Sequence, residues 1–139
     1  MNSQIKDIKQ KFFVFRNGIL ADALRRQYPY SVIFGLQIPQ IAEIARSLTP
    51  SAELARALWA DENVRESRIL ATYLFPPDET EMSTALALAS EVKTVEEADM
   101  LSFRLLKRLP YAPQLREAME SCDEISEYMK KALDNHLGL

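Results

Sequence analysis

Two groups of basic side chains have a spacing that suits phosphate binding on a helix. Arg65 and Arg68 stand three residues apart, and Arg104 and Arg108 stand four apart with Lys107 between them. Residues three or four apart share one helix face, where two cationic groups can meet one phosphate. Both groups are therefore candidate contacts to a nucleic-acid backbone.

Each group also has a purely structural alternative. Glu66 can form ion pairs with one arginine of the first group, which would join helices. The second group lies near the end of its predicted helix, where the helix dipole favours positive charge without any ligand. Trp59 shows the same ambiguity, because its ring can stack on a base or simply fill the core beside Leu58.

Carboxylates gather at one predicted helix start, at Glu96, Glu97 and Asp99. Two carboxylates in different environments can divide acid and base roles. They can also simply stabilise the first helical turn, which favours negative charge. Of the three, Asp99 is the residue for which this structural alternative is weakest. One histidine, one cysteine and three distant glycines leave no basis for a metal site, an iron–sulfur cluster or a glycine-rich phosphate loop, so no metal and no cofactor is expected.

Apolar residues recur at helical spacing along nearly the whole chain, and proline or capping residues separate the segments. Thr49, Thr94 and Ser121 are the predicted caps, of which Thr94 and Ser121 have a glutamate three residues later. The predicted helices cover about 3–15, 16–27, 39–48, 51–60, 63–75, 79–91, 95–108 and 112–120, with a last helix ending near 136.

About nine short helices with very short connections predict an all-α fold. Helix pairs of similar length within 38–120 favour an α–α superhelix of antiparallel helices, as in HEAT or armadillo solenoids. We expect a single domain over 1–139, with about three helix pairs at 38–120 and capping helices at both ends. A compact irregular bundle is the alternative.

The formal net charge of −3 excludes a broadly basic nucleic-acid binder. The charge is uneven, because residues 1–47 carry seven basic side chains and three acidic ones. Since the sequence shows no apolar signal core and no apolar run of membrane-spanning length, we expect a cytoplasmic protein with no membrane partner.

Several short motifs occur together in an order that resembles the DNA alkylation repair enzyme family. They are Phe12-Phe13, Gly35-Leu36-x-Ile38-Pro39-x-Ile41, Ile44-Ala45, Leu58-Trp59 and Arg65-Glu66-x-Arg68 followed by Ala71. The resemblance covers about residues 10–110. It implies a HEAT-like-repeat fold and the excision of alkylated purines from DNA.

The resemblance also implies where catalysis would occur. The family has a Trp-Asp-x-x-Asp element whose tryptophan contacts the cationic lesion and whose last aspartate is catalytic. Aligned here on Ala98-Asp99-x-x-Ser102, it retains Asp99, while Ala98 replaces the tryptophan and Ser102 replaces the catalytic aspartate. A neutral serine cannot stabilise a developing oxocarbenium charge.

The sequence therefore predicts a short family member that binds the backbone of double-stranded DNA, alkylated or not, with absent or weak glycosylase activity. Its DNA contacts would be Arg65, Arg68, Arg104, Arg108 and Trp59. The alternative is a non-enzymatic scaffold that binds a protein partner, since stacked helix pairs present extended surfaces. A third possibility is an active glycosylase with a relocated carboxylate, either Asp99 or Glu96.

Overall fold

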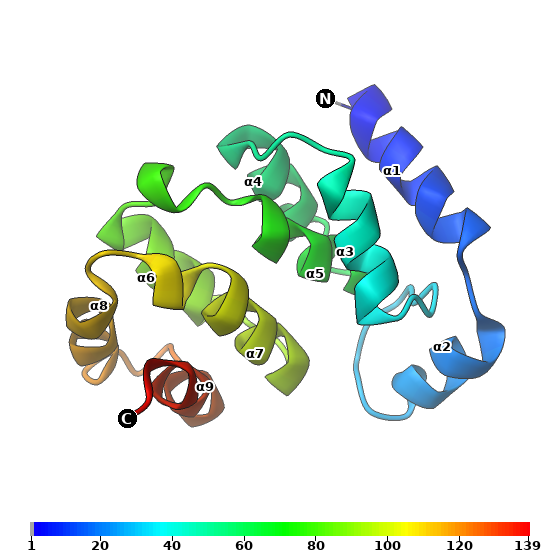
Figure 1. Ribbon diagram of the computed structural model, residues 1–139. Coiled ribbons are helices and arrows are strands. Elements are labelled where there is room, and N and C mark those ends of the chain that lie inside the picture. The colour runs from blue at the N-terminus through cyan, green and yellow to red at the C-terminus, as the bar shows by residue number, and fades with distance from the viewer. Residues whose placement is uncertain (1) are drawn as a thin grey trace. The chain divides into compact units, whose positions relative to one another are not determined.

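The computed structural model describes residues 2–139 and contains, in that part of the chain, nine α-helices and two short 3₁₀-helices (Figure 1). This confirms the predicted all-α class. The elements are α1 (Asn2–Val14), α2 (Gly18–Arg25), α3 (Ile38–Arg46), α4 (Ala52–Ala60), α5 (Arg65–Leu74), η1 (Pro77–Glu79), α6 (Met82–Ser90), α7 (Val95–Arg104), η2 (Leu106–Arg108), α8 (Ala112–Met119) and α9 (Glu127–Leu137).

The predicted cap at Thr94 is confirmed, and two others are wrong. The Thr94 hydroxyl accepts the backbone N–H of Glu97 at 3.0 Å and begins α7. Helix α4 is capped by Ser51 and not by Thr49, and α9 is capped by Ser126 and not by Ser121. Several nearby hydroxyls can serve as caps, and the backbone dihedral angles of the finished fold decide which one does.

The contacts between Cα atoms divide the chain into two compact units, Met1–Leu74 and Phe75–Leu139. In the first, called unit 1, α5 packs against α3 and most extensively against α4. In the second, called unit 2, α7 packs most extensively against α9, and α8 contacts both α6 and α9. Each unit therefore has its own set of packed helices.

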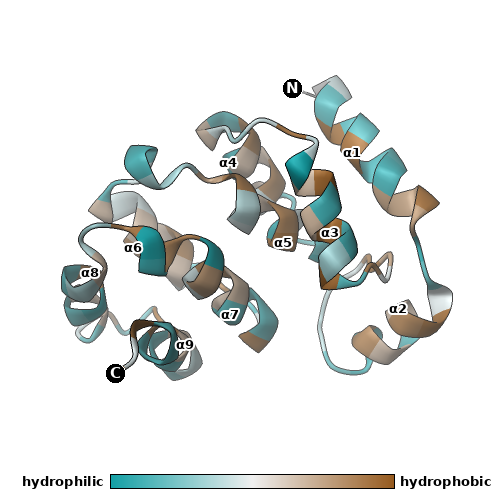
Figure 2. Cartoon of the chain, viewed as in Figure 1, coloured by the Kyte–Doolittle hydropathy of each residue, from teal (hydrophilic) through white to brown (hydrophobic). Residues whose placement is uncertain are grey.

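Helix α5 is the central element of unit 1. All residues from Val64 to Thr72 are buried, including the charged side chains of Arg65, Glu66 and Arg68. Most helices are apolar on one stripe and polar on the other. This mixture of hydropathy along single helices is visible in Figure 2. Because α5 is enclosed on all sides, its charges have to be satisfied inside the protein.

Helix α7 has the opposite character. Ala98, Leu101 and Ser102 face the interior of unit 2, whereas Val95, Asp99 and Phe103 are exposed. Side chains of α7 are therefore available to a ligand. No helix in residues 2–139 has both the length and the apolar composition needed to cross a membrane.

Candidate nucleic-acid interface

The carboxylate of Glu66 is enclosed by backbone amides. It accepts hydrogen bonds from the N–H groups of Phe34, Gly35 and Leu36 at 3.0, 3.0 and 3.3 Å. Gly35 has φ +88°, and a Cβ there would lie 2.2 Å from the backbone oxygen of Asn17. The turn thus requires glycine, and its amides point at a fully buried charge.

Arg65 supplies the opposite charge to the same site. Its Nη1 atom donates to Glu66 Oε2 at 2.9 Å and to the carbonyl oxygen of Leu36 at 2.8 Å. The side chain is 3% exposed, and its hydrogen bond to Leu36 joins α5 to the turn before α3. The ion pair expected for Glu66 is present, but it lies within one helix and does not join two helices.

Arg68 and Trp59 form a second buried contact. The Arg68 guanidinium carbon lies 3.7 Å from the centre of the Trp59 ring, and Nη1 donates to the Trp59 carbonyl oxygen at 2.8 Å. The exposed fractions are 1% for Arg68 and 4% for Trp59. A cation stacked on an indole in the interior stabilises the packing of α4 on α5.

Three of the five predicted DNA contacts therefore lie inside unit 1. A phosphate needs an accessible cation, and neither guanidinium of α5 reaches the surface in this conformation. For the same reason Trp59 presents no ring face to a base. Spacing correctly placed the two arginines together on one helix, but it could not show that this helix is enclosed. We leave Arg65, Arg68 and Trp59 out of the interface proposed below.

Two members of the remaining basic group, Arg104 and Lys107, lie beside an exposed aromatic ring in unit 2. Phe103 is 40% exposed, and its ring centre lies 4.1 Å from Lys107 Nζ and 5.5 Å from the guanidinium carbon of Arg104. Arg108 Nη1 donates to the carbonyl oxygen of Arg104 at 3.2 Å and so occupies one carbonyl at the C-terminal end of α7. We call Phe103, Arg104, Lys107 and Arg108 the basic end of α7.

Asp99 lies one turn before Phe103. It is paired with His136, a contact that the sequence did not predict. Asp99 Oδ1 is 2.7 Å from His136 Nε2, and their side chains are 62% and 22% exposed. The His136 ring also contacts Phe103, with 5.4 Å between ring centres. Because the two partners are 37 residues apart, no local motif indicates the pair.

Ser102 and Ala98 are both fully buried on the inner face of α7. The Ser102 hydroxyl has no hydrogen-bond partner in the described part of the chain. Neither side chain can touch a ligand, so the alignment of the family's tryptophan and last aspartate on these positions puts both in the core. Asp99, on the outer face, is the carboxylate of this segment that meets solvent.

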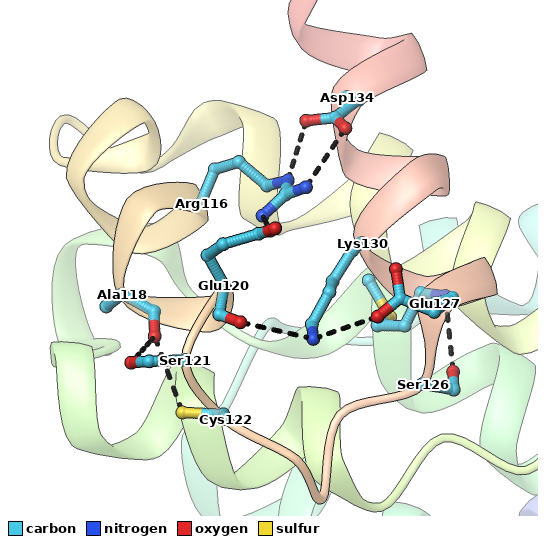
Figure 3. A network of polar contacts seen from close by, with 10 residues as sticks. Arg116, Ala118, Glu120, Ser121, Cys122, Ser126, Glu127, Lys130 and Asp134 are labelled. Carbon is cyan, nitrogen blue, oxygen red and sulfur yellow. Dashed lines mark hydrogen bonds and ion pairs between the residues drawn. The ribbon is translucent and has the colours of Figure 1, made fainter.

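An ion pair joins α8 to α9, the helix that carries His136 (Figure 3). Arg116 binds both oxygens of Asp134 at 2.6 and 3.1 Å and binds Glu120 at 2.9 Å. Lys130 Nζ reaches Glu127 at 3.3 Å and the carbonyl oxygen of Glu120 at 3.5 Å. Hydrogen bonding to Asp134 is the main cause that raises the pKa of Arg116 above its ordinary value.

Tyr111 adds a further structural bond in unit 2. Its hydroxyl donates to the carbonyl oxygen of Thr80, which joins the start of α8 to the segment before α6. Burial, followed by the charge of Glu81, raises the pKa of Tyr111 above its ordinary value of 10.0. In residues 2–139, no three His, Cys, Asp or Glu side chains converge on a point where they could hold a metal ion.

The chain matches the model of a known protein family. The model of the family described as DNA alkylation repair enzyme matches residues 21–124, about three quarters of the chain. The chain belongs to this family. A search of curated proteins and a search of solved structures found no match. The matched range includes Asp99 and the basic end of α7, whereas α1 and His136 lie outside it.

Proposed function

We propose that this member of the DNA alkylation repair family binds the phosphate backbone of DNA through the basic end of α7. The observation that carries the proposal is the position of Arg104 and Lys107 beside the exposed Phe103 ring, with Arg108 bonded to the Arg104 carbonyl oxygen. Cationic groups bind phosphate irrespective of sequence, and an exposed aromatic ring can stack on a base. The family membership supplies the reason to expect DNA as the ligand.

We also propose that glycosylase activity is absent or weak. Trp59 is the single tryptophan of the sequence and is 4% exposed in unit 1, where it is stacked under Arg68. No tryptophan is therefore available to contact a cationic lesion in this conformation. Asp99, an exposed carboxylate, is already in contact with His136, with Oδ1 2.7 Å from Nε2.

If weak activity remains, Asp99 is the residue that would support it. Shifted by three positions, the family's Trp-Asp-x-x-Asp element falls on Val95-Glu96-x-x-Asp99, with an acid in both acidic positions. The side chains of Val95 and Asp99 are both 62% exposed. This alignment places the family's catalytic carboxylate on the outer face of α7, where it can meet a sugar.

DNA binding is tested by fluorescence anisotropy with undamaged and alkylated duplexes over a range of salt concentrations. The double variant Arg104→Ala, Arg108→Ala should reduce the slope of log affinity against log salt by about 2. The control variant Arg25→Ala, Arg46→Ala removes the same charge from exposed positions of unit 1. Absence of binding at low salt, or equal effects of both variants, would contradict the proposed interface.

Catalysis is tested separately by mass spectrometry of bases released from methylated DNA. We expect no release above the rate of the protein-free reaction, or a slow release that Asp99→Asn abolishes. A rapid release, or a release that persists in Asp99→Asn, would show that the activity has been placed wrongly.

A second candidate function rests on a different surface. Four large apolar side chains are exposed around the connection from α1 to α2: Phe13 at 47%, Val14 at 65%, Phe15 at 43% and Ile19 at 86%. An apolar patch of this kind with basic neighbours is typical of a protein-binding surface. The scaffold function gains support if the basic end of α7 proves dispensable for the cellular role and Phe15→Ser, Ile19→Ser does not.

A further inference from the structure

Four side chains from three elements meet on the outer surface of unit 2. Asp99 and Phe103 lie one turn apart on α7, Lys107 comes from η2, and His136 comes from the last turn of α9. His136 contacts both the carboxylate of Asp99 and the ring of Phe103. Lys107 Nζ lies 4.1 Å from the centre of the same Phe103 ring. His136, the Asp99 carboxylate and the Lys107 ammonium group therefore lie close together.

The geometry points to His136 as a protonation-dependent member of the DNA-binding surface, whose positive charge cancels that of Asp99 and strengthens phosphate binding at acidic pH. This inference rests on the proposed DNA binding and names how that site is regulated. It concerns a residue outside the range that the family model matches.

Charge balance gives the direction of the effect. With a neutral imidazole, Asp99 places one negative charge beside the basic end of α7 and repels an approaching phosphate. With a protonated imidazole, both ring nitrogens donate hydrogen bonds, and the pair with Asp99 carries no net charge. Among the standard side chains, imidazole is the one that ordinarily changes charge between about pH 5 and pH 8, and the experiment below spans this range.

The elements around His136 carry other charged side chains. On α7 they include Glu96 and Asp99, and on η2 they are Lys107 and Arg108. On α9 itself, Asp134 is bound by Arg116 of α8, which also binds Glu120. The pairing of α8 with α9 therefore fixes the helix without competing for the imidazole.

The sequence contains no second histidine that would complicate the interpretation of a pH-dependence experiment. His136 is the single histidine among 139 residues, so one side chain accounts for imidazole titration in the entire chain. The protein has to be purified without a polyhistidine tag, because tag residues would titrate over the same range.

The experiment measures the affinity for an undamaged DNA duplex at pH 5.5 and pH 7.5 at constant ionic strength. For the wild-type chain we expect binding about threefold to tenfold tighter at pH 5.5, as for one added charge at close range. His136→Gln keeps a hydrogen-bonding side chain without the charge, and its affinity should be nearly equal at the two pH values. Asp99→Asn should bind more tightly than wild type at pH 7.5, since the repelling charge is gone.

The outcomes separate this inference from the proposed function. If wild-type protein binds DNA equally at both pH values, or if His136→Gln retains the full pH dependence, the inference is wrong and DNA binding stands. If wild-type protein binds no DNA at either pH, the proposed function fails and the inference falls with it. Circular dichroism of each variant at both pH values confirms that the helices are intact.

Discussion

The arginines of α5 and those at the end of α7 have similar spacing and opposite environments. Arg65 and Arg68 are 3% and 1% exposed and are bound to Glu66, to backbone carbonyls and to the Trp59 ring. Arg108 is exposed, and Lys107 with Arg104 surrounds a solvent-facing ring. Two similar sequence patterns therefore serve stability in unit 1 and ligand binding, as we propose, in unit 2.

The difference arises from the neighbours of each helix. Helix α5 is covered by α3, α4 and the turn at Gly35, so a charge on any of its faces has to find a partner within the fold. Helix α7 is covered on one side by α9 and is open on the other. The spacing of residues along a helix indicates which side chains lie on the same face. The packing of neighbouring helices decides whether that face contacts protein or solvent.

The largest expected effect comes from removing the buried carboxylate of unit 1. Glu66→Ala removes the carboxylate paired with the buried Arg65 and leaves three amides without their acceptor, which should lower the free energy of unfolding by about 3–5 kcal/mol. Chemical denaturation followed by circular dichroism measures the loss. The control Glu43→Ala removes an exposed carboxylate and should cost less than about 0.5 kcal/mol. Equal losses for Glu66→Ala and Glu43→Ala would contradict the distinction between the buried and the exposed carboxylate.

A second large effect is expected at the turn that holds Glu66. Gly35→Ala forces a side chain into a left-handed backbone conformation and into contact with the Asn17 backbone, so we expect a loss of about 2–3 kcal/mol. Gly18→Ala is the matched control, because a Cβ there meets no atom within 4 Å. Thermal unfolding should show a clearly lower midpoint for the first variant alone. A stable Gly35→Ala protein would contradict the role of this turn.

A moderate effect is expected between α8 and α9. Arg116→Ala breaks the bonds to Asp134 and Glu120, and the free energy of unfolding should fall by about 1 kcal/mol because the pairs are partly solvent-screened. The Asp99–His136 contact should also weaken, which would appear as a shift of the His136 ring resonances in NMR spectra. Unchanged resonances would show that α9 is positioned without this network.

Tyr111 gives a smaller effect with a defined pH dependence. Its folded-state pKa is raised, so its contribution to stability is complete below pH 10 and is lost as the pH rises above that value. Tyr111→Phe should cost about 1 kcal/mol at pH 7, from the lost hydrogen bond to Thr80. It should also lose less stability than wild type between pH 9 and pH 11. The same alkaline loss in both proteins would assign it to other groups.

Arg108 should contribute little to the stability of the fold and more to DNA binding. Arg108→Ala at the basic end of α7 should change the free energy of unfolding by less than about 0.5 kcal/mol while weakening DNA binding at low salt. Denaturation and anisotropy on the same preparation give both values. A loss of stability comparable to that of Glu66→Ala would show that Arg108 stabilises the fold, as the buried arginines of α5 do, and would contradict its role in the interface.

The helices were largely predictable because local patterns encode them. Apolar spacing located most α-helices to within a few residues, and Thr94 was identified as a cap from its own sequence. The last helix, predicted to begin after Ser121, begins at Glu127. The candidate site was less predictable. Arg104, Arg108 and Asp99 are exposed or partly exposed, as a ligand contact requires, whereas Arg65, Arg68 and Trp59 are buried. Burial depends on residues far away in the chain, which the spacing of a single helix does not report.

The sequence by itself determined the all-α class, the positions of the helices and the family, because helical periodicity, capping residues and short motifs are local properties. The tertiary structure decided which charges are enclosed and which are offered to a ligand. It brought Glu66 to the amides at Gly35 and His136 to Asp99, across 31 and 37 residues. Such pairs form only when packed helices bring distant segments together, since the free energy of a buried or shared charge depends on the complete set of surrounding groups.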